Sequence, residues 1–216
     1  MIDPDLSLGA TTQLYWEHRV IEAAVACARK IPPLATATAG EHADVALIVR
    51  FFDQYVHAWH YANEETYFVP MLRTMGTSSA SSAVLRIDEE HGQSHVALAA
   101  LQAHLAEAGR GDALAPGLFD AAWPRFLDLV LTHVHHEDRY LYRMLMSALS
   151  SPAQRHLGWV LRHAPASEGR QSVPLALEDE VRALSARYAV AFPGWDETLA
   201  SLDQQGRTEV GEKQVG

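Results

Sequence analysis

Residues 60–72, HYANEETYFVPML, and residues 133–145, HVHHEDRYLYRML, are two versions of one pattern set 73 positions apart. In each version a histidine is followed four residues later by a glutamate, as in His60 and Glu64 of the first. Residues four apart on an α-helix lie on one face, so such a pair can hold one metal centre. The sequence therefore predicts a duplicated helical hairpin whose two halves share a metal site.

The same interval relates residues in the preceding helices, because Glu17-His18 matches Glu90-His91. The inward-facing candidates, helix by helix, are His18; His60 and Glu64; His91 and His95; His133 and Glu137. Five imidazoles and two carboxylates suit iron better than calcium or magnesium, which prefer oxygen ligands throughout.

Composition limits the partners of this 216-residue chain. Its hydrophobic content of 48% supports a buried core, and its net charge of −10 disfavours nucleic acid and anionic membranes, since both require basic patches. The single cysteine, Cys27, leaves histidine and carboxylate as the metal ligands. The first residues lack the features of a signal peptide, and no segment approaches the ~18 apolar residues of a membrane span. We expect a cytoplasmic protein.

Apolar periodicity and helix-breaking residues predict four long helices, at about 8–31, 40–74, 78–108 and 116–150. Short connections between them favour an all-α fold, an up-down-up-down four-helix bundle over residues 8–150. Pro70 predicts a local kink in the second helix, and Ser78–Ser82 offers N-cap residues for the third.

Residues 151–202 are expected to form a short helical C-terminal extension, with helices at about 153–162 and 175–192 joined by a linker. Residues 203–216 are polar and are expected to be disordered. The extension is expected either to cap one end of the bundle or to support a homodimer.

The order H…HxxxE…HxxxH…HxxxE/D over roughly residues 10–148 resembles the hemerythrin family, including the broader group of hemerythrin-like cation-binding domains. The Glu-His openings and the Glu-Glu-x-x-Phe-x-Pro-x-Leu sequence that follows the second-helix histidine are similar as well. This resemblance implies a non-haem di-iron centre, bridged by two carboxylates and an oxo or hydroxo group. The ligands it implies are His18, His60, Glu64, His91, His95, His133 and Glu137.

The second bridging carboxylate has two candidates. Oxygen-carrying hemerythrins use HxxxxD at this point, and His133 with Asp138 satisfies that spacing. The internal repeat favours Glu137, which matches Glu64, whereas Asp138 matches Glu65 and is expected to face away from the site.

The ligand count predicts an asymmetric centre. Two six-coordinate irons offer about twelve positions. The implied ligands and bridges leave one position open, on the iron held by His18 and His60. Glu22, four residues after His18, would close this position if it reached the iron.

An open position suits the binding of O2, NO or peroxide, so a carrier, sensor or storage protein is the favoured interpretation. A di-iron enzyme that decomposes peroxide or reduces NO is the alternative, which residue spacing does not separate from the first. A ferritin-like site would need Glu-x-x-His, and a zinc hydrolase is disfavoured by the absence of HExxH. A zinc-binding or metal-free structural bundle is therefore a weaker hypothesis.

Overall fold

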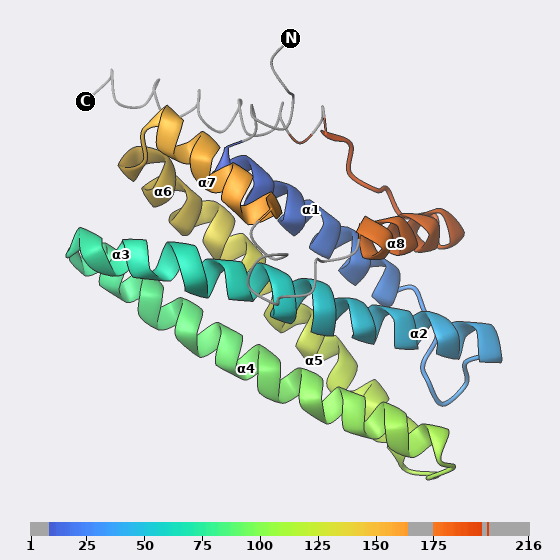
Figure 1. Cartoon of the computed structure of the whole chain (residues 1–216). Coiled ribbons are helices and arrows are strands. Elements are labelled where there is room, and N and C mark those ends of the chain that lie inside the picture. The colour runs from blue at the N-terminus through green and yellow to red at the C-terminus, as the bar shows by residue number, and fades with distance from the viewer. Residues whose placement is uncertain (1–8, 164–174, 196–197, 199–216) are drawn as a thin grey trace, which may run out of the picture.

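The computed structural model describes residues 9–163, 175–195 and 198, and all the regular elements among them are helices. The long helical segments lie side by side, with two shorter C-terminal helices packed on the outside (Figure 1). In chain order, with η for π-helical segments, the elements are α1 (Ala10–Ala28), α2 (Ala39–Phe51), η2 (Phe52–Tyr61), η3 (Glu64–Phe68), α3 (Val69–Met75), α4 (Ser78–Gly109), α5 (Ala115–His136), η4 (Glu137–Leu141), α6 (Tyr142–Ala148), α7 (Ser151–His163) and α8 (Leu175–Arg187). The predicted all-helical fold class is confirmed.

Two helices begin at threonine caps. The Thr38 hydroxyl accepts a hydrogen bond from the Glu41 backbone N–H at 3.4 Å, and the Glu41 carboxylate accepts one from the Thr38 N–H at 2.7 Å. This reciprocal capping box starts α2. Thr77 caps α4 by accepting from the Ala80 N–H at 3.2 Å, so the predicted cap within 78–82 is one residue too late.

Wide π-helical turns begin at the two glutamates of the repeat. The segments η3 and η4 start at Glu64 and Glu137, and in each the N–H five residues later donates to the glutamate C=O. Pro70 follows the first turn, but Arg143 occupies the equivalent position after the second. The proline therefore does not cause the irregularity. Such turns inside α-helices frequently mark functional sites.

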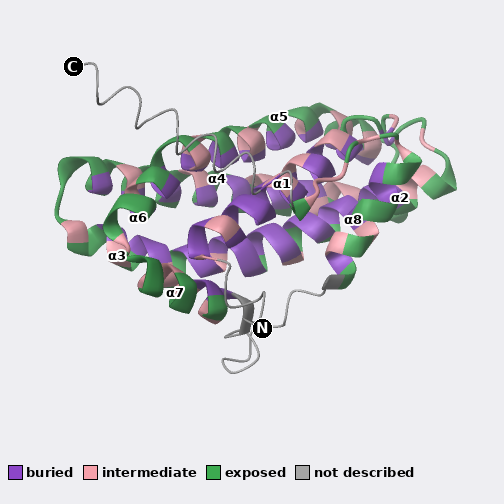
Figure 2. Ribbon diagram, turned by 90° about the horizontal axis from the view of Figure 1, so that it is seen from above, coloured by how far each residue is buried: buried purple, intermediate pink, exposed green. Residues whose placement is uncertain are grey.

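The apolar core has two parts with a polar layer between them. On α1, Leu14 belongs to one cluster and Val20 to the other, and His18 lies between them. On α4, Ile87 and Leu98 flank the polar layer in the same way. Figure 2 shows the buried residues on the inner faces of the helices. The predicted ligands thus lie near the middle of the bundle, between two apolar blocks.

The C-terminal helices pack on the bundle. The α8 residue Glu178 accepts hydrogen bonds from Trp16 Nε1 at 3.3 Å and from the Tyr55 hydroxyl at 2.7 Å, which joins α8 to α1 and η2. The predicted linker lies almost wholly outside the described residues, and the tail over 203–216 lies entirely outside them.

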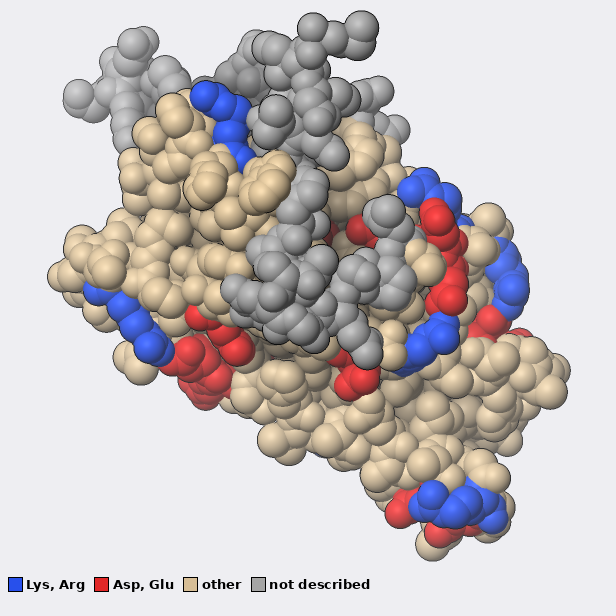
Figure 3. All heavy atoms as spheres, in the orientation of Figure 1, with Lys and Arg blue, Asp and Glu red and all other residues tan. Residues whose placement is uncertain are grey.

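The described helices include none with the length and hydrophobicity to cross a membrane. On the face drawn in Figure 3, lysine and arginine side chains are scattered, most of them beside aspartate or glutamate, and form no continuous basic patch.

Candidate metal centre

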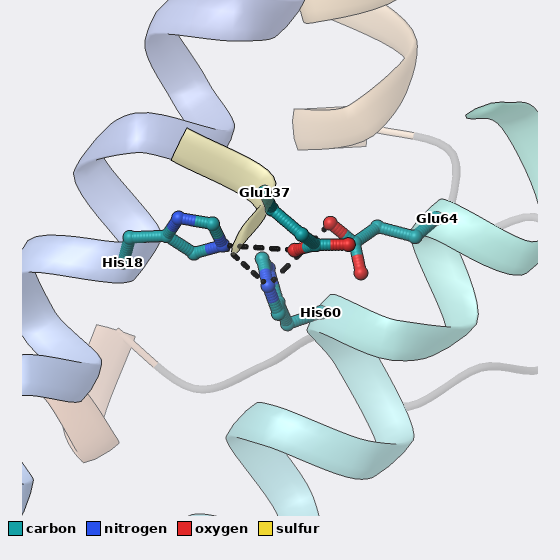
Figure 4. A group of neighbouring side chains, drawn as sticks. All are labelled: His18, His60, Glu64 and Glu137. Atoms are coloured by element: carbon teal, nitrogen blue, oxygen red, sulfur yellow. Dashed lines mark hydrogen bonds and ion pairs between the residues drawn. The ribbon is translucent and has the colours of Figure 1, made fainter. Parts of the chain in front are cut away.

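Six of the seven predicted ligands converge, and they lie on the segments α1, η2, η3, α4, α5 and η4. They form two groups that share both glutamates, and within each group one donor atom from every residue lies within 4.8 Å of the others. Figure 4 shows the first group, whose side chains point toward one another. The two groups are His18, His60, Glu64 and Glu137, and Glu64, His91, His133 and Glu137. All six side chains are buried, with at most 2% of their surface exposed.

The imidazoles face each other in pairs. Nε2 of His18 lies 3.1 Å from Nε2 of His60, and Nε2 of His91 lies 3.3 Å from Nε2 of His133. Each pair joins one residue of a Glu-His sequence to one residue of an HxxxE sequence. The 73-residue repeat is therefore also a repeat in space, with one imidazole pair for each half.

Each glutamate reaches both imidazole pairs. Glu137 Oε2 lies 3.3 Å from Nε2 of His18 and 3.3 Å from Nε2 of His133. Glu64 directs one oxygen toward each pair, at 3.6 Å and 3.4 Å from the nearest imidazole nitrogen. Both carboxylates therefore lie between the pairs, where a carboxylate can bridge two metal ions.

Each of the four imidazoles also contacts a carboxylate through Nδ1, on the ring edge that faces away from the site. The Nδ1 contacts are His18 to Asp138 at 2.8 Å, His60 to Glu17 at 2.8 Å, His91 to Glu65 at 2.8 Å and His133 to Glu90 at 2.9 Å. An Nδ1–H that donates to a carboxylate leaves the Nε2 lone pair directed into the site. Two such lone pairs about 3 Å apart repel unless a proton or a metal ion lies between them.

Glu64 and Glu137 provide a direct indication that a cation belongs here. All four carboxylate oxygens of Glu64 and Glu137 are buried, and none has a hydrogen-bond partner. Burying an ionised carboxylate without a compensating charge or hydrogen bond is strongly unfavourable. Two ligands at right angles, each about 2.1 Å from one ion, are about 3 Å apart, close to the separations found here. The side chains present fit a pair of metal ions.

Without a metal ion, the surrounding carboxylates raise the pKa of one imidazole in each pair. Burial disfavours the charged form of His18, but Asp138 and Glu137 outweigh it and raise the pKa of His18 to about 10. Burial likewise opposes charging of His91, yet Glu64 and Glu65 raise its pKa to about 9. One imidazole of each pair is therefore a strong base, which a metal ion must deprotonate in order to bind.

The structure differs from the sequence-based expectation at His95. Its side chain is exposed and lies outside both groups, with its ring packed against that of His57 at a centroid distance of 4.1 Å. The buried stripe of α4 includes His91 and then Ser94, a step of three residues, so His95 falls beside the stripe. The ring of Tyr61 stacks on His91 at a centroid distance of 3.7 Å and lies 6.2 Å from the ring of His95.

Asp138 and Glu22 also take roles that differ from those expected. Asp138 does not face away from the site but holds Nδ1 of His18, as Glu65 holds His91. It lies outside both ligand groups. Glu22 pairs with Arg19 at 3.2 Å and does not belong to either group.

Sequence reasoning missed two kinds of residue. The four carboxylates behind the imidazoles had a signal, since each occurs at equivalent positions of the repeat beside a predicted ligand. The repeat gave no signal for Tyr142, because Val69 occupies the matching position in the first half. Its buried hydroxyl lies 2.8 Å from Nε2 of His18, and the two rings stack at 5.0 Å. A phenol oxygen therefore reaches the edge of the site.

The fold and the site define a class, the helical bundles that hold metal cations through buried histidines and glutamates. A family model described as the hemerythrin HHE cation binding domain matches residues 10–145, and this chain belongs to that family. Comparisons with curated proteins and with solved structures gave no match. The matched range runs from the start of α1 into α6 and includes all six converging ligands.

Proposed function

We propose that this protein holds a dinuclear non-haem iron centre that binds O2, NO or peroxide, as a carrier, sensor or store. In this proposal the pair His18 and His60 holds one ion and the pair His91 and His133 holds the other. Glu64 and Glu137 bridge the two ions. The observation that carries the proposal is the set of four buried carboxylate oxygens without hydrogen-bond partners, faced by two imidazole pairs.

The ligand set supports iron. It contains imidazoles and carboxylates without thiolate, and two histidines with carboxylate oxygens at an ion with open positions are typical of non-haem ferrous sites. Without His95, each ion receives two imidazoles. The predicted asymmetry in imidazole number is therefore not supported, and the count now leaves about one open position on each ion.

The chain's own groups prepare this site. The carboxylates behind the imidazoles fix the ring orientation, and the two apolar clusters limit access of water. When bound, ferrous ions would supply the open positions and the electrons that small ligands require. The Tyr142 hydroxyl is placed to donate a hydrogen bond to an oxygen atom beside His18.

A di-iron enzyme that acts on peroxide or NO is the second candidate. The same Tyr142 hydroxyl favours it, because a buried hydrogen-bond donor near an open position can assist cleavage of a bound ligand as well as its retention. An assay with excess ligand and an added reductant distinguishes the two candidates. The enzyme converts many ligand molecules per site, whereas a binding protein converts one at most.

We also propose that residues 8–150 form a single up-down-up-down four-helix domain. The short connections between α1 and α2, between α3 and α4, and between α4 and α5 support this topology. Both apolar clusters contain residues from the first and second halves of the repeat, which supports one domain rather than two.

The test is the optical spectrum of the reduced, iron-loaded protein before and after exposure to O2 and, separately, to NO. We expect new charge-transfer bands with each ligand, and their loss in Glu137→Gln because a bridging ligand is removed. Glu89→Gln, an exposed change one residue before Glu90, should behave like the wild type. An iron-loaded protein whose spectrum does not respond to either gas would contradict the proposal.

A further inference from the structure

We propose that a cavity between α4 and the consecutive segments η4 and α6 binds an uncharged organic molecule whose hydroxyl or hydroperoxyl group lies beside His136 and Glu137. This inference rests on the proposed function only in treating Glu137 as part of the metal centre. The cavity has a volume of about 350 Å³ and lies between the helical segments that carry His91 and His133.

The size of the cavity argues against a diatomic gas or hydrogen peroxide as the sole occupant. One water molecule takes ~30 Å³ in the liquid, so the cavity is about ten times larger than those ligands need. Sites for organic molecules usually enclose about 300–1,000 Å³. The cavity lies at the lower end of that range.

The cavity is lined by both apolar and polar side chains. Ile87, Leu141 and Met144 provide apolar walls, whereas Glu90, His136 and Glu137 provide polar atoms. Nδ1 of His136 contacts Glu90 at 2.7 Å, which leaves Nε2 of His136 for a ligand.

These groups select the polar end of the ligand. The His136 ring offers its Nε2 to a ligand, and a carboxylate brought beside Glu90 and Glu137 would be repelled. An O–H group can form a hydrogen bond with the His136 ring without adding negative charge. The exposed Arg86 lies among the lining residues and would favour an anion, so the test includes an anionic probe.

The internal repeat shows that this opening is specific to the second half. Ala83, Ile87 and Leu141 line the cavity, and their equivalents 73 positions earlier are Ala10, Leu14 and Phe68. Those three residues are fully buried in one cluster with Leu161 of α7, a helix that packs along α1.

The helix α7 also lies against the start of α1. The side chain of Gln154 lies 3.5 Å from the position that a Cβ of Gly9 would take, and the equivalent of Gly9 is the cavity residue Ser82. The two halves also differ in exposure, since Glu17 is 1% exposed whereas its equivalent Glu90 is 14% exposed. Tyr140 at the cavity is 53% exposed. The chain covers one of two equivalent grooves and leaves the one beside Glu137 open.

The experiment measures binding of 2-phenyl-2-propanol, an unreactive alcohol analogue of cumene hydroperoxide, by methyl NMR on metal-free and iron(II)-loaded protein. We expect shifts at the methyl groups of Ile87, Leu141 and Met144. Ala83→Trp should weaken binding by about tenfold or more by occupying the cavity. Ala100→Trp, on an exposed position of α4 outside the cavity, is the matched control and should bind as the wild type does.

Ser82→Phe is a second blocking variant, at an exposed position that places little demand on folding. The inference is overturned if both blocking variants bind the alcohol normally, or if phenylacetate binds equally well through Arg86. It is also overturned if a peptide of residues 151–163 displaces the alcohol, since the groove would then be a helix-docking surface. If the wild-type protein binds the alcohol, both blocking variants abolish that binding, and the protein retains no iron, the proposed function is refuted and the cavity site still stands.

Discussion

Replacement of Asp138 by asparagine tests how the imidazoles are held. Asp138 contacts Nδ1 of His18 at 2.8 Å, and its side chain is 14% exposed. Asparagine retains a hydrogen-bond acceptor but removes the negative charge that strengthens His18 as a ligand. Loss of a carboxylate behind a metal-bound histidine costs about 10- to 100-fold in metal affinity, or about 1.4–2.7 kcal/mol. Because Asp138 is largely shielded from solvent, we expect the upper end of this range.

The internal repeat supplies a matched comparison. Glu65 holds Nδ1 of His91 at the same distance of 2.8 Å, but its side chain is 51% exposed. Solvent screens exposed charges, so Glu65→Gln should reduce affinity by about tenfold, at the lower end of the range. Each change should weaken one ion of the pair and leave the other nearly unaffected.

The assay is an anaerobic titration with iron(II) against a chromophoric chelator, which resolves the two binding steps. The reasoning is refuted if Asp138→Asn eliminates one ion while Glu137→Gln retains both. That result would make Asp138 the bridging ligand and restore the HxxxxD interpretation. Equal weakening of both ions by either variant would show that the two imidazole pairs do not act separately.

Three further predictions follow from the geometry. The pKa values of His18 and His91 are about 10 and about 9, above the value of about 6.5 for histidine in the unfolded chain. The stability that these two histidines contribute is therefore complete below pH 6.5 and is lost as pH rises toward 10. The urea midpoint of the metal-free protein should fall as the pH rises from 6.5 to 9.5. Iron loading at pH 7.5 should release about two protons per chain, measurable by calorimetry in buffers of different ionisation enthalpy, and no release would contradict the inferred protonation. Leu161→Ala should lower the free energy of unfolding by about 2–5 kcal/mol, since Leu161 is fully buried, and a loss below 0.5 kcal/mol in urea denaturation would show that α7 is not part of the core.

Residue spacing identified six of the residues that converge, because equivalent positions of the sequence repeat also lie at equivalent places in the fold. His60 with Glu64 and His133 with Glu137 were recognisable as pairs, and their registry placed them in equivalent positions. The same registry contained a warning about His95, whose equivalent is Glu22, a residue that also lies outside both groups.

The remaining features depend on three-dimensional packing. Whether His95 or Ser94 enters the buried stripe depends on whether a helical step is three or four residues, which the sequence of α4 leaves undetermined. The π-helical turns at Glu64 and Glu137 have no recognisable sequence signal, since a proline follows only one of them. The covering of one groove by α7 depends on contacts between residues far apart in the chain, such as the hydrogen bond from the Thr11 N–H to the Gln154 side chain.

Elemental analysis of the protein purified from iron-sufficient cells, combined with a determination of protein concentration, tests the two-ion centre most directly. The arrangement of two imidazole pairs around two shared glutamates predicts about two iron ions per chain. It also predicts that Glu64→Gln and Glu137→Gln both lose iron while the helical content stays the same. About one metal ion per chain, or zinc alone at full occupancy, would contradict it.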